Sequence, residues 1–592
     1  MTETARQNLE LGVIGNGAVA ALVDENAEIV WFCLPRLDGA PIFDSLLGGA
    51  GQFRVSLVDQ CAAHQSYRRN TGVLQTVLEA KDGSAIEIVD FAPRFIDRGR
   101  TFRPASIVRR VRPLRGLPRI KVELAAVGTD GGRLSATRGV SHLSFGGAQP
   151  FRVTTDAPIA YVGAETPFVL ERETTFVLGP DESLSDAPCD ISRSWMERTE
   201  TEWRRWASRL ATPPQWQAAV IRAAITLKMC VYEETGGIVA ALTTSLPEHA
   251  DSGRNWDYRF CWLRDAFFTV GALNRLAAMG TLERYISYLR NVVVDAKGGH
   301  IQPVYGIALE ADLSETIATH LPGYRGMGPV RFGNQAAEHV QHDVYGHVVM
   351  AASQAFFDER LSALAGPLEF EQFEAVGERA YAVHDTPDAG IWEYRGRAQI
   401  HTSSAIMCWA ACDRLAKIAP RVGRADRVSY WASRADEIKT LILKRAWSEK
   451  RQAFTGAYGD DALDASVLLM AEIGFLPADD PRFIATVDRI DKELREGPHV
   501  YRYRREDDFG QPRTAFSACS FWHVEALARC GRNDEACEMF EELLACRTKL
   551  GLFSEDVDTV TGELWGNIPQ TYCMVGVINA ASRLSRPWDW VV

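Results

Sequence analysis

Short alternating apolar runs dominate roughly the first 190 residues of the chain. Ala18–Asp24 and Ile29–Cys33 flank a turn at Glu25–Asn26, which is the pattern of a β-hairpin. Further short runs of β-branched and aromatic residues follow it: Phe53–Val58, Gly72–Glu79, Ala85–Phe91, Ile107–Val111, Ile120–Ala126, Ser141–Phe145 and Phe168–Phe176. Because no helical pattern separates these runs, we predict an antiparallel β-sandwich over residues 1–191.

The spacing of the apolar positions changes near Ser192. Ser194–Leu210 is charged and has a helical pattern, and Pro213-Pro214 ends it. We therefore predict a linker helix over residues 192–213. It separates the sandwich from the rest of the chain.

Residues 214–592 have the period of helices. Long loops, notably Asp295–Asn334 and Gly497–Thr514, separate several of them, and loops of that length are usually functional. Twelve helices with such loops predict an all-α (α/α)6 barrel with its site at one end; a helical solenoid would need a fixed repeat, which is absent. The predicted helices begin near Gln215, Ala266, Leu282, Gln335, Leu368, Thr402, Arg424, Ala462, Pro481, Ala515, Asn533 and Gln570.

Composition narrows the class of protein. Hydrophobic residues make up 46% and charged residues 24%, the balance of a soluble globular enzyme. The net charge of −12 repels nucleic acid and anionic lipid, so we expect neither as a partner. The N-terminus lacks a signal-peptide core, the cysteines form no C-x-x-C pair, and no uncharged stretch reaches the roughly 18 residues that span a bilayer. We expect a cytoplasmic protein, and the sequence leaves a homo-oligomer open.

No cofactor or metal ion is expected. Gly15–Ala20 fits the dinucleotide-binding fingerprint, but a hairpin follows it where that fingerprint requires a helix. His339 and His342 are spaced like zinc ligands without an evident third ligand. Asp556 and Asp558 mimic the start of a calcium loop that lacks its glycine.

Three motifs concentrate polar and aromatic residues at predicted loop-to-helix junctions. The first, Arg254–Asp265, contains three arginines and two aspartates, which are costly to bury without partners. Asp265 is a candidate cap for the helix that begins at Ala266. Capping is compatible with ligand binding, because a neutral polyol needs a carboxylate and a guanidinium for its hydroxyls. We therefore expect Arg264 and Asp265 to bind such a ligand.

The second and third motifs each supply a glutamate. In Gly333–Gly346, Asn334 is a natural N-cap that puts Glu338 in the first helical turn, where a glutamate also complements the helix dipole. In Gly551–Gln570, Glu555 lies in an acidic loop. A barrel would bring both loops to one rim, and two carboxyls facing each other across a cleft are what hydrolysis of a glycosidic bond requires.

Six blocks follow one another along the chain: Leu11–Gly17 through Trp31, Arg254–Asp265, Pro329–Gly346, Gly390–Glu393, Ser520–Trp522 and Gly551–Gln570. In these blocks and their order the chain resembles glycoside hydrolase family 15, the glucoamylases and the bacterial and archaeal trehalases, along nearly its whole length. The resemblance implies that Glu338 is the general acid and Glu555 the general base of an inverting α-glucosidase. It further implies a set of substrate-binding residues: Arg264, Asp265, Trp262, Trp256, Asp257, Trp392, Glu393, Arg502 and Tyr503.

The chain departs from the family's starch-degrading branch. Those members have Trp immediately before the acid and a second carboxylate immediately after it, whereas Ala337 and His339 flank Glu338. We therefore expect an exo-acting glucosidase of glucoamylase type that releases β-glucose from short α-gluco-oligosaccharides, with a trehalase as the alternative. Glu555 argues against an inverting phosphorylase, which needs a cationic phosphate pocket in place of the base. The presence of both carboxylates argues against a non-catalytic sugar-binding protein.

Overall fold

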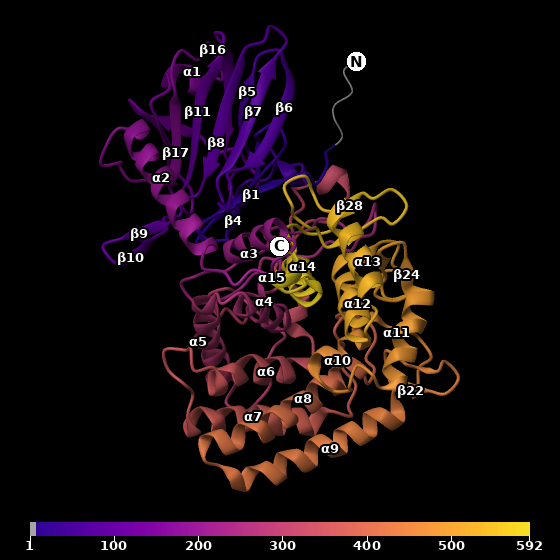
Figure 1. The fold of residues 1–592 in the computed structure, drawn as a ribbon. Helices are drawn as coiled ribbons and strands as arrows, with labels where there is room; N and C mark the ends of the chain where they lie inside the picture. Colours follow the sequence, from indigo (N-terminus) through magenta and orange to yellow (C-terminus); the bar gives the residue numbers. More distant parts are fainter. Residues whose placement is uncertain (1–6, 592) are drawn as a thin grey trace.

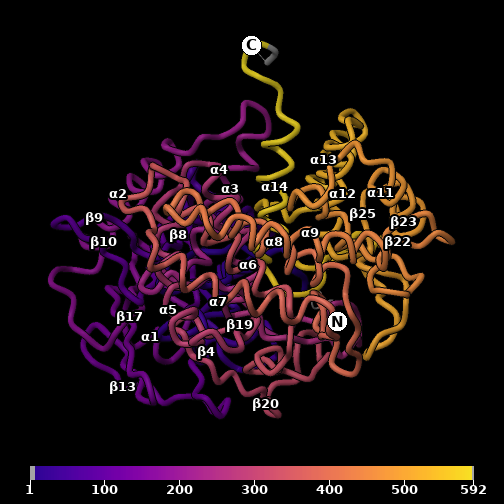
Figure 2. Tube along the Cα trace, turned by 90° about the horizontal axis from the view of Figure 1, so that it is seen from below, coloured from indigo at the N-terminus to yellow at the C-terminus, as the bar shows by residue number. Residues whose placement is uncertain are grey.

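The computed structural model describes residues 7–591. A β-rich part, in indigo and violet in Figure 1, packs against one end of a larger helical part. Figure 2 views the molecule from the opposite end, with the helices in front of the indigo strands. Among the described residues, none of the helices has both the length and the apolar character needed to cross a membrane.

Two antiparallel sheets form the β-rich part and enclose one apolar core between them. The first sheet has the order β1 (Gly12–Gly15), β2 (Ala20–Val23), β3 (Ile29–Leu34), β5 (Gln52–Leu57), β12 (Arg119–Ala125) and β16 (Phe168–Val169), with β4 (Ala40–Phe43) paired to β3. The second has the order β13 (Ala136–Arg138), β14 (His142–Phe145), β15 (Phe151–Thr155), β17 (Thr174–Pro180), β11 (Ile107–Arg115), β8 (Ala85–Phe91), β7 (Leu74–Ala80) and β6 (Gln60–Tyr67). The predicted β-sandwich is confirmed.

The predicted hairpin is the antiparallel pair β2–β3, whose turn is held by Asp24 Oδ1 accepting from the backbone N–H groups of Asn26 and Glu28. The run predicted as one strand over Phe168–Phe176 is two strands, β16 and β17, in different sheets. The edge strand β6 was not predicted, because its side chains are largely exposed and show no apolar alternation.

Helix α2 covers Pro188–Ala207 and packs on the sandwich strands β11 and β17 and on β9 (Phe95–Asp97), which belongs to a separate two-stranded sheet. It begins earlier than the predicted Ser194, since Pro188 is accommodated at the first helical position, where no N–H is needed. Trp203, near the end of α2, is one of the helix's buried side chains.

The helical part is an (α/α)6 barrel. The inner ring consists of α4 (Leu263–Arg275), α6 (Asp343–Phe357), α8 (Thr402–Ile418), the 3-10 turn Ala465–Leu469 with α10 (Met470–Ile473), α12 (Ser517–Arg529) and α14 (Thr571–Leu584). Each inner member contacts the next, and α14 returns to α4, which closes the ring. The outer helices are α3 (Gln217–Met229), α5 (Met279–Ala296), α7 (Pro367–Val383), α9 (Val428–Arg445), α11 (Pro481–Leu494) and α13 (Asn533–Ala545).

Burial distinguishes the two rings. The inner helices α6, α8, α12 and α14 are buried around most of their circumference, whereas outer helices such as α11 bury one stripe. Most helices begin within a few residues of the predicted start. The exceptions are the helices predicted at Gln335 and Ala462, because α6 begins only at Asp343 and α10 only at Met470, after the 3-10 turn Ala465–Leu469.

The sandwich and the barrel share buried polar contacts. Trp31 Nε1 of β3 donates to the carbonyl of Leu242 over 2.9 Å. Arg94 donates to Glu233 over 2.9 Å, and the buried Lys228 pairs with the same carboxylate. Burial alone would raise the pKa of Glu233, but Lys228 and Arg94 hold it below its ordinary value. The two parts are thereby fixed against each other next to the barrel end that carries the site.

Candidate active site

Two adjoining cavities lie at the barrel end where inner helices begin. Four side chains line both of them: Tyr258, Trp392, Glu393 and Arg502. The first cavity is completed by the amino-terminal ends of α4, α12 and α14, including Arg264, Asp265, Phe516, Gln570 and Tyr572. The second is completed mainly by loops and includes Glu248, Arg254, Trp256, His339, Arg395, Asp507, Asp508 and Phe509.

Glu555 is a buried carboxylate in the wall of the first cavity. Its Oε1 accepts a 2.8 Å hydrogen bond from the hydroxyl of Tyr258, while its Oε2 has no partner among the described residues. Gly566, with φ +73°, packs so closely that a Cβ there would lie 2.6 Å from the Cβ of Glu555. The loop therefore needs glycine at this position to seat the carboxylate.

Glu393 lies where the two cavities meet. Its Oε1 accepts a 2.6 Å hydrogen bond from Trp262 Nε1 and lies 3.4 Å from guanidinium nitrogens of Arg264. Its backbone has φ +62°, a left-handed conformation that is strained for a glutamate. Such strain concentrates at functional sites, because the surrounding structure must hold it in place.

The donors to these two carboxylates are neighbouring rings. Tyr258 and Trp262 pack edge to face with their centroids 5.5 Å apart. Tyr258 donates its hydrogen bond to Glu555, and Trp262 donates its hydrogen bond to Glu393. The first polar motif thus presents two carboxylates from distant loops to the same cavity.

Arg264 and Asp265 lie in the first turn of α4 and line the first cavity. The helix begins at Leu263, so Asp265 is not its N-cap; instead its Oδ2 accepts from Arg264 Nε over 3.0 Å. Burial raises the pKa of Asp265, and Arg264 opposes that rise. The predicted carboxylate and guanidinium pair is thus placed where a polyol could bind.

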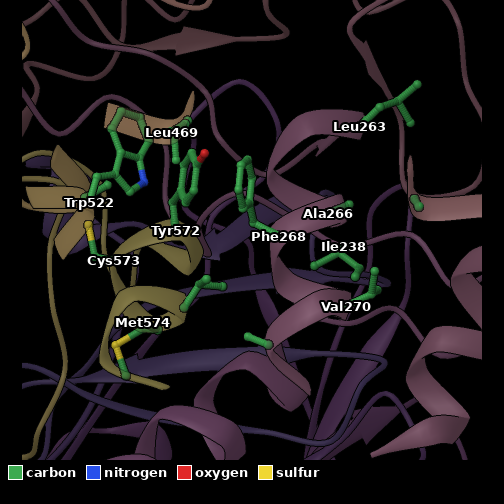
Figure 3. Packing of buried hydrophobic residues seen from close by; sticks show 14 of the residues in the cluster. Ile238, Leu263, Ala266, Phe268, Val270, Leu469, Trp522, Tyr572, Cys573 and Met574 are labelled. Atoms are coloured by element: carbon green, nitrogen blue, oxygen red, sulfur yellow. The ribbon is translucent and has the colours of Figure 1, made fainter. Parts of the chain in front are cut away.

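Aromatic rings form the floor of the first cavity. Tyr572 lies between Trp522 and Phe268, with centroid distances of 5.2 and 4.8 Å (Figure 3). Its hydroxyl has no hydrogen-bond partner among the described residues, which leaves it available to a ligand. Trp392 packs on Trp522 at 5.9 Å.

Three buried carboxylates meet beside the first cavity. Glu248, Glu555 and Asp556 each place an oxygen within 4.8 Å of the others. Arg502 donates to Glu248 over 2.7 Å and lies 3.5 Å from Asp556, and Arg254 lies 3.8 Å from Glu248. The guanidinium groups of these two arginines already supply the positive charge that a metal ion would bring to the carboxylates, so the cluster fits a metal ion poorly.

The cluster changes the proton affinity of Glu555. Burial and the carboxylates of Glu248 and Asp556 raise the pKa of Glu555 well above its ordinary value, while Arg502 and the Tyr258 hydrogen bond oppose the rise. Burial likewise raises the pKa of Asp556.

Glu338 is not brought together with Glu555. Asn334 caps as predicted by accepting from the backbone N–H of Ala336, but it begins only a short 3-10 turn, Gln335–Glu338. Ala336 and Ala337 are buried, which turns Glu338 to the exposed side, and it lines neither cavity. The expected first helical turn lies later, at Asp343.

Two other predicted substrate contacts have structural partners instead. Asp257 is buried against Arg259, which donates to it over 2.9 and 2.7 Å, and it lines neither cavity. Alternation along the extended motif explains this, because Tyr258 faces the cavity and its two neighbours face the sandwich. Tyr503 is also absent from the lining, and its hydroxyl donates to Asp507.

Several residues that line the cavities were not predicted from the sequence. Tyr258 and Arg254 lie inside the first motif but were not selected. Trp522 and Gln570 lie in quoted blocks and were also passed over. Glu248 and Asp507 carry no local motif and are recognised only by the buried arginines that they pair with.

Comparisons with known proteins agree with this architecture. Residues 215–582 match the glycosyl hydrolases family 15, and residues 2–125 match the trehalase-like N-terminal domain. A protein named trehalase from Mycolicibacterium smegmatis is 33% identical over 98% of this chain and 91% of its own length. One named trehalase from Thermoplasma volcanium is 29% identical over 97% and 93%.

A solved structure of similar fold is a bacterial glucoamylase complexed with acarbose, with a TM-score of 0.69 at 12% identity, covering 98% of this chain and 94% of that one. The low identity makes this a likeness of fold. The chain belongs to glycosyl hydrolases family 15 and is a glycoside hydrolase.

Proposed function

We propose that this enzyme hydrolyses α,α-trehalose with inversion of configuration. The observation that carries the proposal is the pair of adjoining polar cavities that share Glu393, one for each glucose ring. The relatives named trehalase, which match nearly the whole chain, favour trehalose over the malto-oligosaccharides expected of a glucoamylase.

Glu393 is the proposed general acid, in place of Glu338. It lies at the junction of the cavities, where the bond between two rings would cross, and Trp262 and Arg264 fix its carboxyl. Trp392 stands immediately before it, as Trp stands before the acid in the family's starch-degrading members, so the departure from that branch noted at Ala337 does not apply to Glu393. An acid here would donate its proton to the glycosidic oxygen.

Glu555 is the proposed general base. Glu555 lines the first cavity, and its buried Oε2 has no partner among the described residues, so we assign to this oxygen the proton taken from an attacking water. Tyr258 holds the other oxygen and thereby orients the carboxylate. Arg264 and Asp265 would bind hydroxyls of the glucose whose anomeric carbon is attacked.

A substrate panel tests the proposal. Trehalose, maltose, isomaltose and a dextrin are incubated with the enzyme, and released glucose is measured. We expect trehalose to have the highest kcat/KM. A clear preference for maltose or dextrin would contradict the proposal and indicate a glucoamylase activity instead.

A further inference from the structure

A tight turn over Asp507–Gly510 lies on the second cavity. Asp507 and Gly510 pair through backbone hydrogen bonds of 3.3 and 3.2 Å, and Gly510 has φ +87°. Asp507, Asp508 and Phe509 all line the cavity. The long segment that joins α11 to α12 thus places this turn in the cavity that is lined mainly by loops.

The turn is fastened on two sides. The Asp507 carboxylate accepts from the guanidinium of Arg254 and from the hydroxyl of Tyr503, and the side chains of Arg254 and Asp507 are each only 4% exposed. On the other side, Asp508 Oδ2 accepts from the backbone N–H groups of Arg395 and Gly396 over 2.6 and 3.1 Å. The turn therefore bridges the first polar motif and the segment that carries Glu393.

The side of the turn that faces the second cavity combines aromatic and charged side chains, as sugar-binding surfaces do. Phe509 packs edge to face on Trp256 with centroids 5.1 Å apart, and Arg395 lies 4.3 Å from the Trp256 ring. Trp256 Nε1 donates to Glu248 over 3.1 Å. Aromatic surface rimmed by charged hydrogen-bonding groups suits the apolar face and the hydroxyls of one sugar ring.

We infer that the Asp507–Gly510 turn is the element that selects the leaving group: it closes the second cavity around a single glucose and so restricts the enzyme to disaccharides. The inference rests on the proposed function, since the second cavity is taken to hold the departing ring. A longer leaving group would have to extend through the space that the turn occupies.

The test compares substrates that fill the second cavity to different extents. α-Glucosyl fluoride leaves it empty, trehalose fills it with one ring, and a trisaccharide with one more glucose on a ring of trehalose overfills it. The variants are Phe509→Ala, which removes the aromatic ring of the turn, and Asp508→Ala, which releases the turn from the Glu393 segment. The matched control is Phe357→Ala, an exposed residue at the end of α6 that lies in neither cavity.

For Phe509→Ala we expect KM for trehalose to rise about three- to tenfold, the range of one lost aromatic contact, with kcat/KM for the fluoride unchanged. In both turn variants the ratio of trisaccharide to trehalose hydrolysis should rise, and Phe357→Ala should match the wild type on every substrate. Unchanged ratios, or equal losses on all three substrates, would overturn the inference. A wild-type enzyme that cleaves the fluoride and leaves trehalose intact would instead refute the proposed function.

Discussion

The hydroxyl of Tyr258 donates a 2.8 Å hydrogen bond to Oε1 of Glu555, a residue 297 positions further along the chain. The two neighbours of Tyr258 face away from the cavity, and Arg259 donates over 2.6 Å to the carbonyl of Gly39 in the sandwich. The orientation of the proposed base therefore depends on a loop segment that is hydrogen-bonded to the N-terminal part. This connection gives the sandwich a role in positioning the site.

Glu393→Gln should lower kcat on trehalose at least a hundredfold, because an amide cannot donate the proton that the departing glucose requires, and acid catalysis contributes about 10²–10⁴-fold. Glu338→Gln is the matched control and should retain kcat within about twofold, since Glu338 is exposed and lies outside both cavities. Steady-state kinetics on trehalose measures both. A large loss in Glu338→Gln with an active Glu393→Gln would restore the assignment made from sequence.

Leaving groups should separate the acid from the base. Fluoride departs with little need of a proton, so Glu393→Gln should lose much less activity on α-glucosyl fluoride than on trehalose. Glu555→Gln should be poor on both substrates, because each reaction needs an activated water. If the two variants responded alike to the leaving group, the roles assigned here would be unsupported.

The pH dependence of kcat/KM should report the environment of Glu555. Its pKa is raised by burial and by Glu248 and Asp556, so the active, ionised base is lost at a higher pH than for an ordinary glutamate as the pH falls. Tyr258→Phe removes a hydrogen bond to the ionised form of Glu555. The acidic limb of the kcat/KM profile should therefore shift to higher pH, by about 1 pH unit. Glu248→Gln removes a negative charge that repels the ionised Glu555, so the acidic limb should shift to lower pH. Shifts of the same sign in both variants would contradict this electrostatic account.

Much of the fold could be predicted from sequence because its signals are local. The β2–β3 turn and the apolar stripe of α4 depend on residues close together in the chain. Glu555, Arg264 and Asp265 were predicted because each stands beside a junction that a barrel must bring to one rim, and all three line the first cavity. Their arrangement around Tyr258, by contrast, depends on contacts between distant segments.

Glu338 lies outside both cavities for a physical reason. An N-cap at Asn334 predicts a helix, but Ala336 and Ala337 are buried beside Trp262, so the chain makes one 3-10 turn and continues extended to α6. Glu393 shows no helical or strand pattern, since its left-handed backbone is held by the turn in which its N–H donates to the carbonyl of Gly390. A strained site of this kind departs from local sequence preference.

The buried pair Asp257–Arg259 should stabilise the junction of sandwich and barrel. Arg259→Ala leaves a buried carboxylate unpaired and should lower the free energy of unfolding by about 3–5 kcal/mol. The control is Arg133→Ala, which removes an exposed partner of Glu165 and should change the free energy of unfolding by less than about 1 kcal/mol. Denaturant unfolding measures both, and equal effects would show that burial of the Asp257 pair does not matter.

The configuration of the first glucose released from trehalose tests the central claim most directly. Attack by a water that Glu555 activates inverts one anomeric carbon, while the other glucose departs with its configuration unchanged. Proton NMR in the first minutes of hydrolysis should therefore show α- and β-glucose in equal amounts, before mutarotation mixes them. Release of α-glucose alone would mean retention and would contradict the account, as would an enzyme that leaves trehalose intact.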